Sequence, residues 1–140
     1  MKPVNVAVVG VTGAVGEVML EILESRNFPV DTLFPLASAR SAGKSVTFRG
    51  KRHTVQDLSE FDFSQTPIAL FSAGGDISAE FAPIAAAAGC VVIDNTSHFR
   101  RDADIPLVIP EVNPDAIGQF RNRGIIANPN CSTIGMLVAL

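Results

Sequence analysis

Two short motifs contain the residues best suited to chemistry. The first is the glycine triplet of GVTGAVG, formed by Gly10, Gly13 and Gly16. The second is NPNCST, in which Cys131 follows a strand-like segment and precedes a helical pattern. Glycines in a turn between a strand and a helix let a diphosphate approach the free N–H groups of the helix. A cysteine in the first turn of a helix gains thiolate character from the helix dipole.

Together the two motifs predict a nicotinamide-linked reaction of an aldehyde. An activated thiolate adds to the aldehyde, the adduct gives a hydride to the cofactor, and a thioester results. The alternative for Cys131 is a small buried cysteine at a helix start, and the spacing leaves both interpretations open. The alternative for the glycine motif is a tight turn without a ligand. Cys90, before the strand-like VVID, is expected to be structural.

The residues after the second strand-like segment favour NADP over NAD. Sites for NAD usually carry an acidic residue about 20 positions beyond the glycine turn. Here the segment ends in ASARS, where Arg40, Ser38 and Ser41 suit a 2′-phosphate because guanidinium and hydroxyl groups bind its oxygens. The alternative is that Arg40 is a solvated loop residue.

A pair of arginines, Arg100 and Arg101, follows another strand end in DNTSHFRRD. A guanidinium binds carboxylate or phosphate through two parallel hydrogen bonds. Consecutive side chains of an extended segment point to opposite faces, so one of the two is expected to face a site. His98 lies in the same segment; nothing in the sequence places it against Cys131, so a role as catalytic base is only the lesser alternative. Arg121 and Arg123 are expected in a solvated turn.

Alternating strand and helix patterns position these motifs. Continuous apolar runs are typical of parallel strands covered on both faces. Strands are expected in residues 4–10, 31–40, 67–75, 90–97 and 124–130, with two short strand-like pieces in 45–50 and 52–56. Helices are expected in residues 14–25 and 77–89, and residues 102–117 read as loop, short strand and short helix. This alternation predicts an α/β domain with βαβ units and a mostly parallel sheet.

Two further expectations follow from these elements. The apolar face of the first helix is predicted to consist of Val15, Val18, Met19, Ile22 and Leu23. Ligands bind such sheets beyond the carboxyl ends of the strands. One crevice should therefore be lined by the five strand ends, at Gly10, 38–40, 72–75, 95–97 and 128–130.

Length and composition narrow the class of protein. A chain of 140 residues, 47% of them hydrophobic, has the size of one globular domain. The net charge of −3 and the lack of a basic block argue against nucleic acid and membrane surfaces as partners. No signal peptide or membrane-spanning run is recognised. Two cysteines far apart suit a reducing cytoplasm, and no metal site is predicted.

Four motifs in order, GVTGAVG, DNTSHFR, PLVIPEVN and NPNCST, make the chain resemble the N-terminal half of aspartate-β-semialdehyde dehydrogenase. The resemblance covers the whole chain, and NPNCST together with PEVN is its specific pairing. N-acetyl-glutamyl-phosphate reductase shares the general plan, and glyceraldehyde-3-phosphate dehydrogenase shares the thioester chemistry. The sequences around their cysteines differ from this one.

The resemblance implies a Rossmann-like, doubly wound NADP-binding domain in residues 1–130. Residues 131–140 would begin the helix that carries the catalytic cysteine and leads into a second, catalytic and dimerisation domain absent from this chain. Members of the family are more than twice as long, so the chain is expected to be a fragment with little or no turnover alone. The alternatives are a free-standing NADP-binding or sensing module and a fragment that folds only with a partner piece.

The implied activity is the reversible, NADP-dependent oxidative phosphorylation of L-aspartate 4-semialdehyde to 4-phospho-L-aspartate. It belongs to the biosynthesis of lysine (through diaminopimelate), methionine and threonine. The implied partners are this substrate and inorganic phosphate, and the full-length protein would be a homodimer or homotetramer.

The resemblance also assigns roles to individual residues. It implies that Cys131 is the acyl-thioester nucleophile, that Arg100 binds phosphate and that Asn130 lies beside the substrate. The family's FR pattern selects Arg100 over Arg101. With the glycine motif, the resemblance assigns the cofactor to Gly10, Thr12, Gly13, Ala14, Val15, Gly16, Arg40, Ser41, Ser72 and Gly74.

Overall fold

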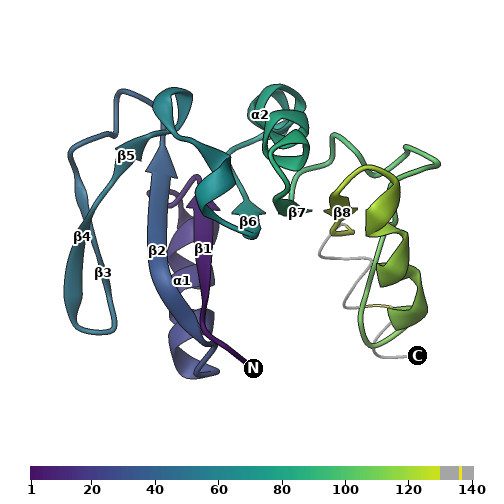
Figure 1. Cartoon of the computed structure of the whole chain (residues 1–140), viewed down its shortest axis with the longest axis horizontal. Coiled ribbons are helices and arrows are strands. Elements are labelled where there is room, and N and C mark those ends of the chain that lie inside the picture. The colour runs from purple at the N-terminus through teal and green to yellow at the C-terminus, as the bar shows by residue number, and fades with distance from the viewer. Residues whose placement is uncertain (130–135, 137–140) are drawn as a thin grey trace.

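The computed structural model describes residues 1–129 and Met136, and it places them in a central sheet with helices on both faces (Figure 1). The strands are β1 (Val4–Val9), β2 (Val30–Ala37), β3 (Ser45–Phe48), β4 (Lys51–Thr54), β5 (Gln56–Asp57), β6 (Ile68–Phe71), β7 (Val91–Asp94) and β8 (Ile125–Ala127). The α-helices are α1 (Ala14–Ser25) and α2 (Gly75–Ala87), and the 3₁₀ helices are η1 (Leu58–Glu60), η2 (Phe63–Gln65) and η3 (Pro114–Asn122). The strands and helices predicted in residues 4–97 and 124–129 are confirmed, with ends that differ by a few residues. The helix expected to begin at residue 131 lies outside the described residues.

The sheet is parallel throughout, with the strand order β5-β2-β1-β6-β7-β8. Renumbered along the chain, this is the order 3-2-1-4-5-6 of a doubly wound dinucleotide-binding fold. The direction of winding reverses between β1 and β6, and ligands of such sheets bind at that point. The predicted α/β architecture is therefore confirmed. Strands β3 and β4 form a separate antiparallel hairpin at one side of the sheet (Figure 1).

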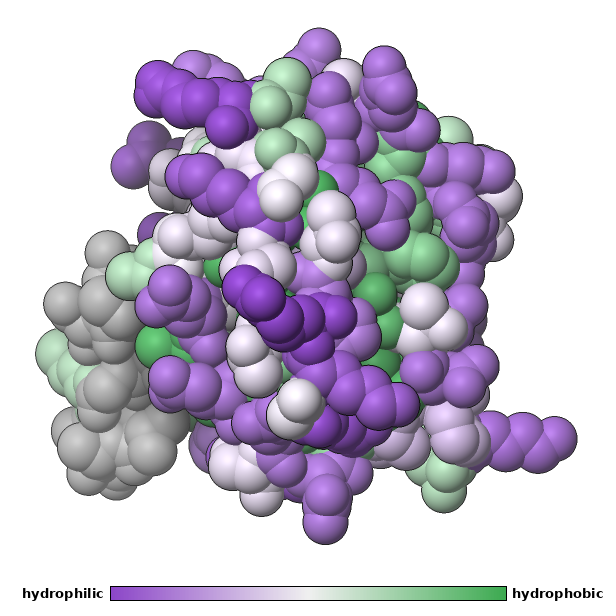
Figure 2. All heavy atoms as spheres, turned by 90° about the vertical axis from the view of Figure 1, so that its left-hand side faces the viewer, coloured by the Kyte–Doolittle hydropathy of each residue, from purple (hydrophilic) through white to green (hydrophobic). Residues whose placement is uncertain are grey.

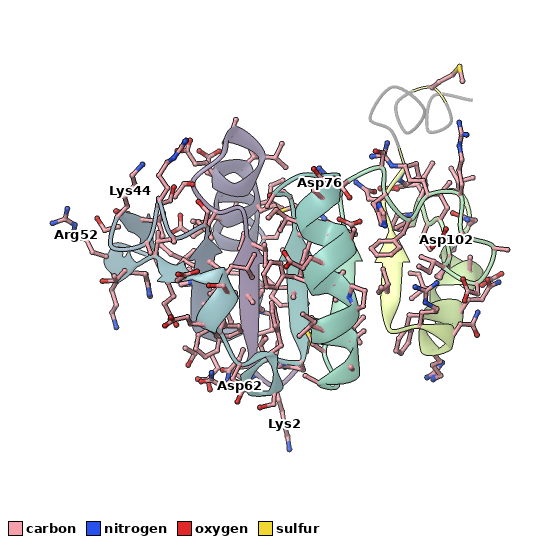
Figure 3. The ribbon with its side chains drawn as sticks, turned by 90° about the horizontal axis from the view of Figure 1, so that it is seen from above. Lys2, Lys44, Arg52, Asp62, Asp76 and Asp102 are labelled. Atoms are coloured by element: carbon pink, nitrogen blue, oxygen red, sulfur yellow. The ribbon has the colours of Figure 1, made fainter. Side chains whose placement is uncertain are left out.

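Helices α1 and α2 cover opposite faces of the sheet, as the view from above shows (Figure 3). Alternate residues of β1 accordingly belong to different cores. Val9 lies in a buried cluster with Ala82 of α2, whereas Val8 lies in a second buried cluster with Leu20 of α1. The near-continuous apolar sequence of β1 is the signal of a strand buried from both sides.

The predicted apolar face of α1 is wrong in part. Three of its members, Val15, Val18 and Ile22, are each 47% exposed. Gly16 and Leu20 are buried instead, and Leu23 packs against the same core. The reason is the glycine: Gly16 has no side chain and lets α1 approach the turn after β1 closely. The stripe at positions i, i+4 and i+7 from Gly16 then faces the sheet.

The segment between β7 and β8 matches its expectation loosely. Leu107 makes an isolated bridge to Ala127 at the end of β8, and the short helix is the 3₁₀ helix η3. Arg121 lies within η3, and Arg123 pairs with Asp102 (3.6 Å) and Asp104 (3.2 Å). The predicted solvated turn for the two arginines is therefore only partly right.

The face that carries the β3–β4 hairpin is covered mostly by hydrophilic residues, with smaller apolar areas between them (Figure 2). Lys44 and Arg52 project outward at this end of the molecule (Figure 3). Among residues 1–129 and Met136, no helix combines the length and apolar character needed to cross a membrane.

Replacing Gly16 with alanine is expected to lower the free energy of unfolding by at least about 2 kcal/mol, despite the better helix propensity of alanine. A Cβ at Gly16 would lie 2.3 Å from the carbonyl oxygen of Gly10 and 2.7 Å from Cα of Val11. Gly13→Ala is the matched control, because its Cβ would lie 3.5 Å from the same oxygen, an ordinary contact. Urea unfolding measures both variants. Equal stability of the two would contradict the packing described here.

Candidate active site

A pocket of about 320 Å³ opens at the carboxyl ends of β1, β2 and β6. It lies at the point where the winding of the sheet reverses, the position at which open α/β sheets bind nucleotides. Its lining residues come from the turns after these strands, from η1 and from the start of α2: Gly10, Thr12, Gly13, Ala37, Ser38, Ser41, Leu58, Ser72, Ala73 and Ile77.

The glycine turn forms one wall of the pocket. Gly10 has φ +87°, and a Cβ there would lie 2.9 Å from the backbone nitrogen of Ala73. Only glycine therefore allows the turn after β1 to touch the turn after β6. Gly13 is the N-cap of α1, and no side chain of the described residues caps this helix end. The first N–H groups of α1 remain available to an anion.

The pocket contains half of the residues that were predicted to bind the cofactor. Gly10, Thr12, Gly13, Ser41 and Ser72 line it. The other five lie nearby, for separate reasons. Ala14 and Val15 form the first turn of α1, behind Gly13, and Gly16 is buried beneath the turn. Gly74 is the N-cap of α2, and Arg40 is exposed at the tip of the turn after β2.

The apolar part of the pocket was not predicted. It consists of Ala37, Leu58, Ala73 and Ile77. Leu58 arrives from η1, which follows the edge strand β5, and Ile77 from the first turn of α2. These residues carry no local signal in the sequence, because only the strand order brings them together.

The remaining two strand ends meet in a separate polar cluster. The side chains of Asn95 and Asn128, which follow β7 and β8, are joined by a 2.6 Å hydrogen bond from Nδ2 of Asn128 to Oδ1 of Asn95. Arg100 donates from Nε to the carbonyl oxygen of Asn128 (2.8 Å) and from Nη2 to that of Asn95 (3.3 Å). The expectation of a single crevice is therefore wrong: three strand ends line the pocket and two hold Arg100.

A buried carboxylate supports this polar cluster. Asp94, the last residue of β7, is fully buried. It accepts hydrogen bonds from Ser78 Oγ of α2 (2.7 Å), from Thr96 N (3.1 Å) and from Thr96 Oγ1 (2.8 Å). These bonds satisfy the carboxylate and fix the turn that leads to Arg100. Sequence reasoning missed Asp94 and Ser78, although an acid that ends an apolar strand could have marked the former.

Residues 5–120 match the family model described as semialdehyde dehydrogenase, NAD binding domain. The chain belongs to this family. The match includes every residue that lines the pocket and, in the polar cluster, Asn95 and Arg100, whereas Asn128 lies beyond it.

Individual relatives of this chain are aspartate-semialdehyde dehydrogenases. Aspartate-semialdehyde dehydrogenase 2 of Vibrio cholerae is 71% identical over 97% of this chain and 40% of the relative. The crystal structure of aspartate semialdehyde dehydrogenase II from the same organism, complexed with ASA, has a TM-score of 0.98 and 70% identity, covering 99% of this chain and 45% of that one. The enzyme of Candida albicans with NADP has a TM-score of 0.82 and 27% identity, covering 98% and 45%. The chain spans less than half the length of these relatives.

Arg100 and Arg101, the two candidate anion ligands of this semialdehyde dehydrogenase chain, have different surroundings. Arg100 is half-buried and bound to two backbone carbonyls, whereas Arg101 is exposed. The ring of His98 packs edge-on against Phe99, with 4.6 Å between the ring centroids. Asn130 and Cys131, which were predicted beside the substrate and as nucleophile, lie outside the described residues.

A larger hollow of about 560 Å³ lies at the amino ends of β7 and β8, between α2 and η3. It is at the edge of the sheet opposite to the one where ligands bind such folds, so we do not assign it to the cofactor. Cys90 contributes to its wall but is itself only 2% exposed. Burial raises the pKa of the Cys90 thiol to about 12. The prediction that Cys90 is structural agrees with this position.

Cys90 is expected to resist alkylation in the folded chain. With its pKa raised by burial, the thiol stays protonated at pH 8, so iodoacetamide should react at least about a hundredfold more slowly than in the urea-unfolded chain. Raising the pH from 8 to 10 should accelerate the reaction of the unfolded chain, while the folded chain stays slow. The Cys131→Ser variant leaves Cys90 as the single thiol of the chain. Peptide mass spectrometry measures the rates, and equal rates in both states would contradict the burial.

Proposed function

We propose that this chain is the nucleotide-binding part of an NADP-dependent, phosphorylating aspartate-semialdehyde dehydrogenase. The observation that carries the proposal is the 71% identity to the Vibrio cholerae enzyme over 136 residues. Because the alignment leaves out so few of the 140 residues, Cys131 lies within the aligned region. In this proposal residues 1–130 bind the cofactor, and residues 131–140 lead into the part of the protein that contains the rest of the active site.

The pocket at the switch point fits a dinucleotide. Gly10 and Gly13 leave the backbone open to a diphosphate, and the N-terminus of α1 offers N–H donors and the positive end of its dipole. The apolar wall that includes Leu58 and Ile77 suits a flat aromatic base. The chemistry that NADP supplies when bound is the acceptance or donation of one hydride.

The turn after β2 supports a preference for NADP. Ser38 and Ser41 line the pocket, and the carbonyl oxygen of Ser38 accepts hydrogen bonds from the backbone nitrogens of Ser41 (2.9 Å) and Ala42 (3.1 Å). Arg40 lies at the tip of this closed turn, between the two serines. Asp31 is near the start of β2, so β2 itself carries no acidic residue at its carboxyl end to bind a ribose 2′-hydroxyl. Asp57 of the neighbouring β5 pairs with the last residue of β2, but its carboxylate accepts hydrogen bonds from Ser59. A guanidinium and two hydroxyls in this place suit a 2′-phosphate.

The proposed reaction assigns the nucleophile to Cys131. Its thiolate attacks the aldehyde carbon of aspartate 4-semialdehyde and forms a C–S bond, and the carbonyl oxygen takes a proton. Loss of that proton to a base and of a hydride oxidises the adduct to a thioester. An oxygen of inorganic phosphate then attacks the thioester carbonyl, the C–S bond breaks, and 4-phospho-L-aspartate leaves. In the opposite direction the same steps supply the semialdehyde to lysine, methionine and threonine biosynthesis.

Arg100 is the proposed phosphate ligand. Its Nε and Nη2 bind backbone carbonyls, which holds the guanidinium in place. Nη1 has no partner within the part of the chain that the structure describes, so this nitrogen can donate to an anion. Asn130 stands next to Cys131 in the sequence and is proposed to contact the substrate. The full-length protein is proposed to be a homodimer or homotetramer.

Arg40→Ala is expected to weaken NADPH binding by roughly tenfold or more, because a charge-assisted contact to the 2′-phosphate is lost. NADH lacks that phosphate, so its affinity should change by less than about twofold. Arg52→Ala is the matched control, since Arg52 projects into solvent from β4 (Figure 3). Titration of cofactor fluorescence measures all affinities. Tighter binding of NADH than of NADPH by the unaltered chain would refute the NADP preference.

The longest natural reading frame that contains this chain is expected to form NADPH only when aspartate 4-semialdehyde and phosphate are both present. Cys131→Ser should lower this rate by at least about a thousandfold, since catalytic groups act as a unit. Cys90→Ala, at the other cysteine, should stay within about threefold of the unaltered rate. The 140-residue chain alone should turn over little or not at all. NADPH absorbance follows the reaction, and a Cys131→Ser protein as active as the unaltered one would refute the thioester mechanism.

A further inference from the structure

We propose that Asn95 and Asn128 are positioning residues that set the guanidinium of Arg100 for phosphate. This inference rests on the proposed function, in which Arg100 is the phosphate ligand. It concerns two asparagines that lie on different strands and were singled out in the sequence only as strand ends.

The geometry joins the asparagines and the arginine in one closed arrangement. The two side chains are bonded to each other at 2.6 Å. The two carbonyl oxygens that accept from Arg100 belong to these same residues. The amide contact between Asn95 and Asn128 therefore controls the distance between the two acceptors. That distance in turn selects the orientation of the planar guanidinium, because Nε and Nη2 must reach both oxygens at once.

The arrangement is anchored from below by the sheet. The backbone nitrogen of Asn128 donates to the carbonyl oxygen of Asp94 (2.8 Å), and that of Asn95 donates to the carbonyl oxygen of Phe71 (2.9 Å). Asp94 itself is held by Ser78 and Thr96. These bonds fix the strand ends. The side-chain contact then fixes the carbonyls just beyond them, where the ladder of the sheet has ended.

Each asparagine thus acts on the anion through the arginine. Arg100 uses its Nε/Nη2 edge for the two carbonyls, and Nη1 has no partner among residues 1–129 and Met136. Without the amide contact the two carbonyls can separate, and the guanidinium gains freedom that phosphate binding must then remove. The loss should appear in the interaction with phosphate and leave the nucleotide pocket, which is built from other strand ends, unaffected.

The test measures KM for phosphate in the longest natural reading frame that contains this chain. Asn128→Ala and Asn95→Ala remove the same part-buried hydrogen bond from either side, so each should raise this KM by about tenfold. The KM for phosphate of the double variant should be no more than about twofold higher than that of either single variant. NADPH affinity and KM for the semialdehyde should stay within about twofold in all three. Asn122→Ala, at an exposed asparagine of η3, is the matched control.

A cycle with Arg100→Ala separates the possible outcomes. Arg100→Ala should raise KM for phosphate, and Asn128→Ala should then add less than about twofold. If Arg100→Ala leaves this KM unchanged, the phosphate role of Arg100 fails, and the positioning role fails with it. If Arg100→Ala raises it but neither asparagine variant does, only the positioning role is refuted. The positioning role is also refuted if Asn128→Ala raises KM for phosphate equally in the unaltered protein and in the Arg100→Ala variant. It is refuted as well if Asn128→Ala weakens NADPH binding to the same extent. Should Asn128→Ala fail to fold, Asn95→Ala carries the same test.

Discussion

The contact between the turn after β1 and the turn after β6 is the constraint on which the site depends. Gly10 permits it, since a Cβ would lie 2.9 Å from both the nitrogen of Ala73 and the carbonyl carbon of Ser72. From adjacent strands the two connections leave for opposite faces of the sheet, and the pocket is the space between them. Gly16 extends the same constraint, because it allows α1 to lie directly on the turn. Both glycines therefore serve packing as much as ligand access.

The local sequence pattern was sufficient to predict the strands and helices, but it did not predict which elements lie next to each other in the fold. The apolar run of β1 and the helical spacing of α1 reveal both elements, because burial from both sides and helical periodicity leave direct traces in the sequence. The position of β5 beyond β2 leaves no such trace. The presence of Leu58 in the pocket could therefore not be predicted from the sequence. The spacing of the apolar residues that begin with Val15 likewise predicted that α1 is a helix. Which side of α1 packs against the sheet is decided instead by Gly16, because only a residue without a side chain fits against the turn after β1.

The polar cluster illustrates the same limit at the level of the site. Residue type and position marked the pair of Arg100 and Arg101 as candidate anion ligands, and the family resemblance selected Arg100. Its two neighbours, Asn95 and Asn128, look like ordinary turn residues, because asparagine is common wherever strands end. Their roles depend on a pairing between β7 and β8 that only the fold creates. The sequence of this chain therefore reveals candidate ligand-binding groups more readily than the groups that we propose to orient them.

The parallel sheet also has a consequence for how the chain folds. Within it, Leu36 pairs with Gln56 across a moderate stretch of chain, whereas Val6 pairs with Ile68 across a much longer one. Closing a longer loop costs more chain entropy, so the pairing of β1 with β6 is the most demanding in the sheet. That same pairing creates the pocket. A ligand that bridges its two sides stabilises the contact that is hardest to form, so folding and nucleotide binding are thermodynamically coupled at the centre of this domain.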